Sequence, residues 1–515
     1  MGVANRELEL KLELTGDELG RIQALTTLRD LAMGEPASQQ LRSLYFDTLD
    51  RRLHARGLSL RIRRVGESWL QTLKFETDMY GGISRPGELE TTVDGPKPDV
   101  QAIPDKVVRK RVKKAIGEAP LVPLFEMVVE RTARRLKELD GTEIELALDK
   151  GVVRGAEGSK DLCEAELELK SGNPDALVSV AEKLFADGAM RLSEASKAEW
   201  GYRLGDQQKH VKLEPLKASM PKLDATQSCA EAFREICRTA TDHILHNWAV
   251  VAESDDPEGT HQMRIALRRL RSLLKVFRPV VDNEGMRELD LKARDLGLLL
   301  GELRDADVAM DTVGAAAAQR SDDADLASLK GVLANSRAHH REKVRAELEG
   351  RQWSRLKLKL AMLPECVDQL VGEENSKVLA KPIGRLTNKV LGKWWRKIIK
   401  AGRRIDSLSG AERHEMRKRL KTMRYAVEFL APLYPAKDVR RFTKKLRSLQ
   451  DKFGYLNDVA VAEKLKLVRA DGTSDPGLQR AVGYVIGWHA AHAERAWNDI
   501  CSGWKRFAKS SPFWA

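Results

Sequence analysis

The sequence has no long apolar run. A membrane-spanning helix needs about 18 or more consecutive apolar residues, and no such stretch occurs in the 515 residues. Residues 1–5 lack the apolar core of a signal peptide. The five cysteines are odd in number, scattered and without a CxxC spacing, which indicates reduced thiols rather than a disulfide framework. We therefore expect a soluble, cytoplasmic chain without membrane segments.

Acidic residues are scarce in the second part of the chain. Residues 1–205 carry 32 Lys and Arg against 35 Asp and Glu, whereas residues 206–515 carry 57 against 41. The net charges are therefore −3 and +16, and the second part is expected to meet a polyanion such as polyphosphate, nucleic acid or an anionic membrane. Aromatic residues are few and do not interleave with the basic ones, so nothing beyond bulk charge favours nucleic acid.

Hydrophobic patterning predicts an α+β multidomain protein. Residues 1–204 contain about eight short alternating runs typical of an antiparallel sheet rolled into a barrel or tunnel, with a basic helix near 105–116. Residues 205–225 contain Gly and Pro without periodicity and are interpreted as a linker. Residues 226–512 show helical spacing throughout, which indicates an all-α region of bundle type.

The predicted strands carry charge on one face. From Glu7 to Leu12 charged residues alternate with leucines, which for a single strand indicates a solvated face. However, Arg61, Arg63 and Lys74 on neighbouring strands would repel one another unless an anion lies between them. Opposed carboxylates and cations inside a barrel would suit a divalent metal and a phosphate chain. The other alternating charges are Glu88/Glu90, Glu143/Glu145 and Glu164/Glu166/Glu168/Lys170.

The helical region contains an internal repeat, roughly 226–370 and 380–510. A basic motif recurs at an offset of 153 residues, and so does the segment 301–305 at 454–458. The motif spacing places one His and three cations on one helix face. A solvated stripe is the ordinary interpretation, but recurrence in the same phase favours an anion-binding surface. The two copies are His261, Arg264, Arg268, Arg271 and His414, Arg417, Lys421, Arg424.

Five motifs occur in order along the first part of the chain. They are Glu7-x-Glu9-x-Lys11, Tyr45–Thr48, Gly57–Arg63, Gln71–Lys74 and Cys163–Lys170. Together they resemble the CYTH family, the triphosphate tunnel metalloenzymes, over about residues 3–203. The resemblance implies an eight-stranded antiparallel tunnel that hydrolyses triphosphates or cyclises ATP.

The resemblance also implies roles for particular residues. It assigns catalysis to Glu7, Glu9, Lys11 and Lys74, and Mg²⁺ or Mn²⁺ binding to Glu7, Glu9, Glu164, Glu166 and Glu168. It assigns substrate binding to Lys11, Arg61, Arg63, Lys74, Glu88, Glu90 and Arg131. Arg109 and Arg111 on the basic helix fit either a substrate contact or a solvated face.

The helical region resembles the CHAD family over about 225–510. The matching segments are His261–Arg271, Arg304–Asp307, His414–Tyr425 and Leu449–Asp458. The resemblance implies two related antiparallel bundles that bind inorganic polyphosphate on a basic surface, through the eight repeat residues given above. The remaining histidines fit either further anion contacts or ordinary structural positions.

The tandem arrangement is similar to that of bacterial inorganic triphosphatases, which split tripolyphosphate into pyrophosphate and phosphate. We therefore expect a metal-dependent inorganic triphosphatase with a polyphosphate-binding helical domain. An adenylate cyclase or nucleoside triphosphatase of the same fold is one alternative, and a non-catalytic polyphosphate-binding or targeting module is another. The oligomeric state does not follow from the sequence.

Overall fold

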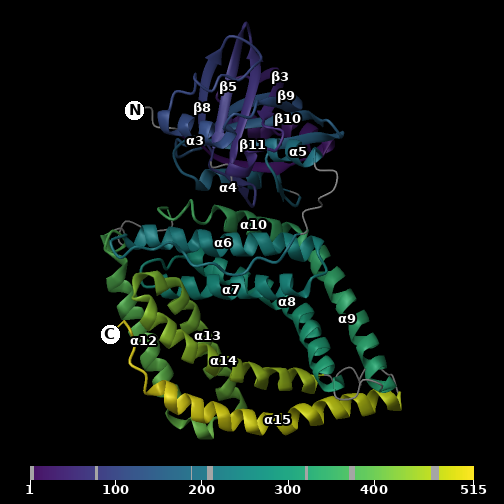
Figure 1. Cartoon of the computed structure of the whole chain (residues 1–515), viewed down its shortest axis with the longest axis vertical. Helices are drawn as coiled ribbons and strands as arrows, with labels where there is room; N and C mark the ends of the chain where they lie inside the picture. The colour runs from purple at the N-terminus through teal and green to yellow at the C-terminus, as the bar shows by residue number, and fades with distance from the viewer. Residues whose placement is uncertain are drawn as a thin grey trace. The chain divides into compact units, whose positions relative to one another are not determined.

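The computed structural model describes residues 5–75, 79–186, 188–205, 213–318, 323–369, 377–464 and 475–514. Side chains are described throughout these ranges except at 5–6, 80, 455–464 and 492–494, so the predicted contacts of Asn457 and Asp458 lie outside the described residues. The chain divides into two compact units: 1–212 with 349–369, and 213–348 with 370–515. We call them the β unit and the helical unit (Figure 1).

The β unit is built on one antiparallel sheet, and the predicted antiparallel β-tunnel architecture is confirmed. Among the described residues, eight strands have six or more residues and four have two. The long strands are β2 (Leu8–Glu13), β3 (Ala37–Asp47), β4 (Leu58–Val65), β5 (Ser68–Phe75), β8 (Gly87–Val93), β9 (Val122–Lys137), β10 (Glu143–Gly155) and β11 (Gly158–Ser171). The short strands are β1 (Asn5–Arg6), β6 (Met79–Tyr80), β7 (Ile83–Ser84) and β12 (Arg191–Leu192).

The amino-terminal strand closes this sheet. Beyond β2 the sheet continues with β7 and β6, and β12 also pairs with β2. From β1 to β2 the strand order is β1-β8-β5-β4-β3-β9-β10-β11-β2, and β1 and β2 are consecutive pieces of the same stretch of chain. Asn5 pairs with Glu88 at one end of this order, while Leu10 pairs with Leu167 at the other. The stretch from Asn5 to Glu13 therefore pairs with β8 on one side and with β11 on the other, which closes the long strands into a tunnel.

The apolar face of the sheet points away from the tunnel. Leu58, Leu60 and Ile62 of β4 are buried in a cluster with Val112 and Ala115 of α3 (Lys106–Ile116). The alternate residues of the same strand therefore point into the tunnel, because successive side chains of a strand face opposite sides. The other helices of this unit are α1 (Gly16–Ala24), α2 (Thr26–Leu31), α4 (Asp175–Leu184), α5 (Lys197–Leu204) and α10 (Arg351–Met362), with a 3-10 turn η1 (His54–Arg56).

Among its described residues, the helical unit contains two sets of four long helices. The first set is α6 (Cys229–Glu253), α7 (Pro257–Phe277), α8 (Glu284–Ala317) and α9 (Ala324–Leu348). The second is α12 (Ile383–Ala401), α13 (Gly410–Leu430), α14 (Ala436–Lys464) and α15 (Pro476–Ala508). Adding the sequence offset of 153 to the bounds of α7 gives the bounds of α13, as the internal repeat predicts. Within the described ranges, no helix has both the length and the apolar character that crossing a bilayer requires.

Candidate functional site

The tunnel holds a cavity of about 750 Å³. Of the residues predicted for catalysis, substrate or metal in this part of the chain, all but one line it. Glu164 is the exception: it is buried and does not line the cavity. The predicted residues in the lining are Glu7, Glu9, Lys11, Arg61, Arg63, Lys74, Glu88, Glu90, Arg131, Glu166 and Glu168.

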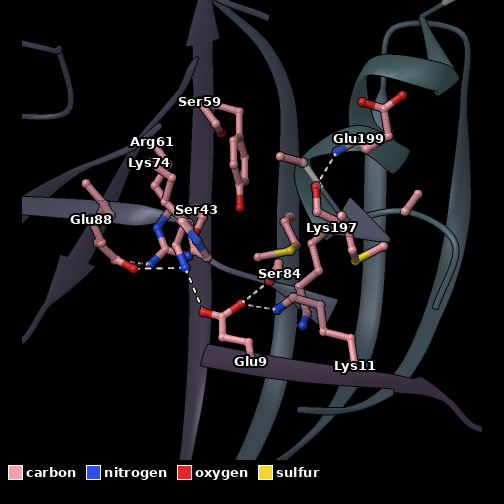
Figure 2. Close-up of a pocket in the computed structure, with 18 of the residues that line it drawn as sticks. Glu9, Lys11, Ser43, Ser59, Arg61, Lys74, Ser84, Glu88, Lys197 and Glu199 are labelled. Atoms are coloured by element: carbon pink, nitrogen blue, oxygen red, sulfur yellow. Dashed lines mark hydrogen bonds and ion pairs between the residues drawn. The ribbon is translucent and has the colours of Figure 1, made fainter. Parts of the chain in front are cut away.

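Glu9 lies between two lysines from different strands. Lys74 Nζ is 3.1 Å from Glu9 Oε1, and Lys11 Nζ is 2.8 Å from Glu9 Oε2 (Figure 2). Ser84 Oγ donates to the same carboxylate at 3.0 Å. Burial would raise the pKa of Glu9, but the two lysines hold that pKa at about 2. Glu9 is therefore ionised and already neutralised from two sides.

A second charged group surrounds Lys197, which the sequence analysis did not single out. Its ammonium lies 2.9 Å from Asp149 Oδ2, 2.8 Å from Glu164 Oε2 and 2.6 Å from Glu166 Oε1. Arg131 donates to Asp149 at 2.7 Å and to Glu166 at 2.6 Å. Burial would lower the pKa of Lys197, but the three carboxylates raise it. Glu164 and Glu166 are therefore engaged by protein cations.

Two carboxylates of the cavity have too little positive charge beside them. Burial, and then the charges of Glu88 and Glu168, raise the pKa of Glu7 to about 7. Burial also raises the pKa of Glu168, although Lys170 lies 2.6 Å from it. Carboxylate oxygens with raised pKa values fit a hard divalent cation chemically. Among the described residues, however, no three acidic, His or Cys side chains are close enough to form a ready-made metal site.

Two of the arginines of β4, Arg61 and Arg63, retain free hydrogen-bonding capacity. Arg61 lies 3.6 Å from Glu88 and Arg63 lies 3.2 Å from Glu90. The Nε atoms of both arginines are buried, and within the described part of the chain neither has a hydrogen-bond partner. Buried donors without acceptors are unfavourable in the free protein, so these two N–H groups suit an incoming anion.

The wall near η1 contains residues that the sequence analysis also missed. His54 Nε2 lies 2.8 Å from Glu199 Oε2, and the His54 ring stacks on Tyr202 at 4.1 Å between centroids. By contrast, the basic helix α3 does not line the cavity. Arg109 donates to the carbonyl of Gln101 and Arg111 to that of Arg56, each at 2.9 Å. Both arginines of α3 therefore fix loops in this structure.

In the helical unit the two basic motifs form one group, because α7 packs against α13. Burial and the charges of Arg268 and Arg417 lower the pKa of Lys421 to about 6. Burial, followed by Arg304, lowers the pKa of His261. Lys421 on α13 therefore lies close to the arginines of the basic motif on α7. We call this group the central cluster: His261, Arg264, Arg268, Arg304, Arg417, Lys421 and Arg424.

Two predicted members differ from the others. Arg271 Nε donates to Asp290 at 2.7 Å, so its charge is already balanced. His414 is exposed near Arg417 and Lys418. Of the remaining histidines, His243 is buried against Gln262 at 3.2 Å and His489 against the carbonyl of Thr312 at 3.3 Å, which are structural positions.

Comparison with known proteins agrees with this division. The family model of the CYTH domain matches residues 5–202, and that of the CHAD domain matches residues 235–466. The chain carries a CYTH domain followed by a CHAD domain. The closed sheet with its charged interior corresponds to the CYTH match, and the repeated helices to the CHAD match.

Individual relatives cover one part each. An inorganic triphosphatase from Haemophilus influenzae is 30% identical over 207 residues, or 39% of this chain and 56% of that protein. The chain thus spans little more than half the length of this curated relative. The CHAD domain of the plant Ricinus communis is 28% identical with a TM-score of 0.50, covering 58% of this chain and 98% of that one. A Hippeastrum protein described as having a dominant triphosphatase activity is 20% identical with a TM-score of 0.29, covering 39% and 96%.

Proposed function

We propose that the CYTH domain hydrolyses inorganic triphosphate to pyrophosphate and phosphate with the help of a divalent metal. The observation that carries this proposal is the charge arrangement inside one enclosed cavity. Cations from β2, β4, β5 and β9 face carboxylates of β1–β2, β8 and β11 across a space of about 750 Å³. A short, highly charged phosphate chain with bound metal needs both kinds of group at once.

The cations would hold the phosphate chain. Arg61 and Arg63 offer the two unpartnered Nε–H groups, and Lys74 lies beside them at the cavity wall. Arginine and lysine donors of this kind bind phosphoryl oxygens and stabilise the charge that develops there. In hydrolysis, water oxygen forms a new bond to the terminal phosphorus while the bridging P–O bond breaks. A cavity carboxylate would orient that water and accept its proton.

The metal would be held on the Glu7 side of the cavity. Glu7, Glu9 and Glu168 lie near one another there, and burial raises the pKa values of Glu7 and Glu168, which nearby cations do not fully offset. Glu164 and Glu166 instead already contact Lys197 at 2.8 and 2.6 Å. When bound, Mg²⁺ or Mn²⁺ would neutralise phosphate oxygens and polarise the phosphorus. Of the five predicted ligands, Glu7 and Glu168 are therefore the two that protein cations leave under-balanced, whereas Glu9, Glu164 and Glu166 already contact lysines.

A comparison of substrates tests the activity. The full chain is incubated with tripolyphosphate, ATP or long-chain polyphosphate, each with Mg²⁺ or Mn²⁺, and phosphate and cyclic AMP are measured. We expect phosphate release mainly from tripolyphosphate and only with metal. Formation of cyclic AMP would instead support the cyclase alternative, and no turnover of any substrate would support a non-catalytic module.

For the CHAD domain we propose binding of inorganic polyphosphate at the central cluster. Lys421 is half-buried among arginines of both motifs, and burial together with the charges of Arg268 and Arg417 lowers its pKa; this crowding of cations is unfavourable until an anion binds. Replacing Arg264, Arg268, Arg417 and Lys421 with Gln should abolish binding of short polyphosphate chains and leave tripolyphosphate hydrolysis intact. Unchanged affinity would contradict this role.

Because the unpaired cysteines of the chain suit a reducing compartment, we place both activities in the cytoplasm.

A further inference from the structure

Helix α12, labelled in Figure 1, carries a stripe of exposed cations. Between residues 375 and 405 the sequence contains ten Lys and Arg but no Asp or Glu. The buried face of α12 is uncharged and includes Val390 and Leu391. Exposed on the other side are Arg385, Lys389, Lys393, Arg396 and Lys400. Within the described part of the chain, none of these five forms an ion pair or a side-chain hydrogen bond.

The five cations form a nearly straight line. Their spacing of three or four residues keeps them on one side of the helix, and the stripe from Arg385 to Lys400 is about 22 Å long. Like charges at this spacing lower the stability of a helix when nothing anionic lies against them. The stripe is therefore unfavourable in the free chain.

The first repeat shows that the fold does not require these cations. The starts of α6 and α12 are joined by two equivalent hydrogen bonds, from Cys229 N to the carbonyl of Lys381 at 2.9 Å and from Ile383 N to that of Gln227 at 3.1 Å. This pairing relates the two helices at an offset of 154 residues. At that offset, buried residues of α6 correspond to buried residues of α12. They are Cys229, Phe233, Ile236, Cys237 and Ile244 in α6, and Ile383, Thr387, Val390, Leu391 and Ile398 in α12.

At the same offset the two helices have opposite charge. The positions of α6 that correspond to the stripe carry three acidic residues and no Lys or Arg. They are Glu231, Glu235, Thr239, Asp242 and His246, opposite Arg385, Lys389, Lys393, Arg396 and Lys400. Because the same scaffold position tolerates acidic residues, packing does not explain the stripe on α12.

The surroundings of the stripe select among polyanions. Among the described residues, α12 exposes no large apolar side chain that could insert into a bilayer. The ring of Trp395 is occupied by Phe442 and Phe507, with centroids 5.6 and 5.3 Å away, so it offers no platform for nucleic-acid bases. The main feature of this face is a linear row of charge, which matches a flexible chain of phosphates.

We propose that the solvent face of α12 binds inorganic polyphosphate as a tract separate from the central cluster. This inference rests on the polyphosphate binding proposed for the CHAD domain. A short chain occupies the central cluster alone, whereas a long chain also reaches α12. Engaging two tracts at once raises the apparent affinity for long chains without changing that for short ones.

The test compares two fourfold variants of the full chain. The first carries Arg385→Gln, Lys389→Gln, Lys393→Gln and Arg396→Gln. The control carries Arg278→Gln, Arg287→Gln, Lys343→Gln and Arg480→Gln, which removes the same charge from exposed cations that already contact Asp282, Glu302 or Asp325. Affinity is measured for polyphosphate of several hundred units and of about ten, at several salt concentrations.

We expect the α12 variant to lose about tenfold or more in affinity for the long chain only. Its slope of log affinity against log salt should also fall by about 3, because roughly 0.7 counterion is released for each contact with a single-stranded polyanion. The control should keep wild-type affinity and slope. Equal behaviour of the two variants, or a loss seen with single-stranded RNA but not with polyphosphate, would overturn the proposal. If the unmodified chain binds no polyphosphate, the polyphosphate binding proposed for the CHAD domain is wrong. If the unmodified chain binds polyphosphate but the α12 variant binds it equally well, that function stands and only the α12 tract is ruled out.

Discussion

Lys74 and Glu9 form an ion pair of 3.1 Å across the tunnel, although 65 residues separate them. They lie on β5 and β2, two strands that do not pair with each other. The contact therefore depends on closure of the sheet. It places a phosphate-binding candidate directly beside a metal-binding candidate, which is the juxtaposition that phosphoryl transfer needs.

Removing the charge of Glu9 should abolish hydrolysis and preserve the fold. Glu9→Gln keeps the shape of the side chain but leaves Lys11 and Lys74 without their shared carboxylate. We expect metal-dependent phosphate release to fall about 100-fold or more. The control is Glu67→Gln, whose side chain is 98% exposed. Wild-type activity in both Glu9→Gln and Glu7→Gln would rule out the metal role of this strand.

The division of the five carboxylates predicts which of them bind metal. Mn²⁺ affinity without substrate, measured by calorimetry, should fall at least about tenfold in Glu7→Gln and Glu168→Gln. In Glu164→Gln it should stay near the wild-type value, because the Glu164 carboxylate is bound by Lys197 and Ser193. The reverse order of effects would place the metal beside Lys197 instead.

Much of the β unit could be predicted from the sequence, because its strands alternate strictly. The motif Gly57–Arg63 falls on β4 from its second residue onward, and the basic helix predicted near 105–116 is α3. Alternating charges show which residues share one face of a strand, but they do not show whether the charged faces of different strands meet in one cavity. That depends on which strands are neighbours and on how the ends of the sheet meet.

The residues that were missed lack a local signal. Lys197 begins a helix after its N-cap Ser196, where a lone lysine normally faces solvent. Asp149 shares a strand face with Glu143 and Glu145, so the side of the strand on which it lies could be predicted. Its partner Lys197, however, lies 48 residues further along the chain. In the helical unit, spacing placed the cations on one face of each helix. Only the packing of α7 on α13 shows that Lys421 and Arg268 belong to one cluster.

Lys197 should be important for stability as well as for the site. Its replacement by Met leaves Asp149, Glu164 and Glu166 buried without their shared cation. We expect the free energy of unfolding of the β unit to fall by about 3 kcal/mol, measured by urea denaturation. Lys183→Met is the control, because the contact of Lys183 with Glu138 is more exposed and should be worth less than about 1 kcal/mol. Similar losses of unfolding free energy in the two variants would mean that the contacts of Lys197 contribute no more than an ordinary surface ion pair.

Lys421 should couple polyphosphate binding to proton uptake. With a pKa of about 6, it is mostly neutral at pH 7, and a bound polyanion favours its charged form. Binding should therefore strengthen as pH falls from 8 toward about 6 and should take up close to one proton at Lys421, with a further contribution from His261, whose pKa is also lowered. Calorimetry at pH 7 in two buffers of different ionisation enthalpy measures this uptake.

The Lys421→Met variant separates the effect of this lysine on the stability of the helical unit from its effect on polyphosphate binding. The folded pKa lies below the ordinary value of 10.5, so between about pH 6 and that value the unfolded chain holds a proton that the folded chain lacks. This group therefore makes the helical unit more stable as pH rises through that window. The variant should lose this pH dependence, gain on the order of 1 kcal/mol at pH 7, bind polyphosphate more weakly and take up about one proton less. Lys418→Met, at an exposed site 3.8 Å from Glu415, should change none of these, and unchanged proton uptake in Lys421→Met would show that another group titrates.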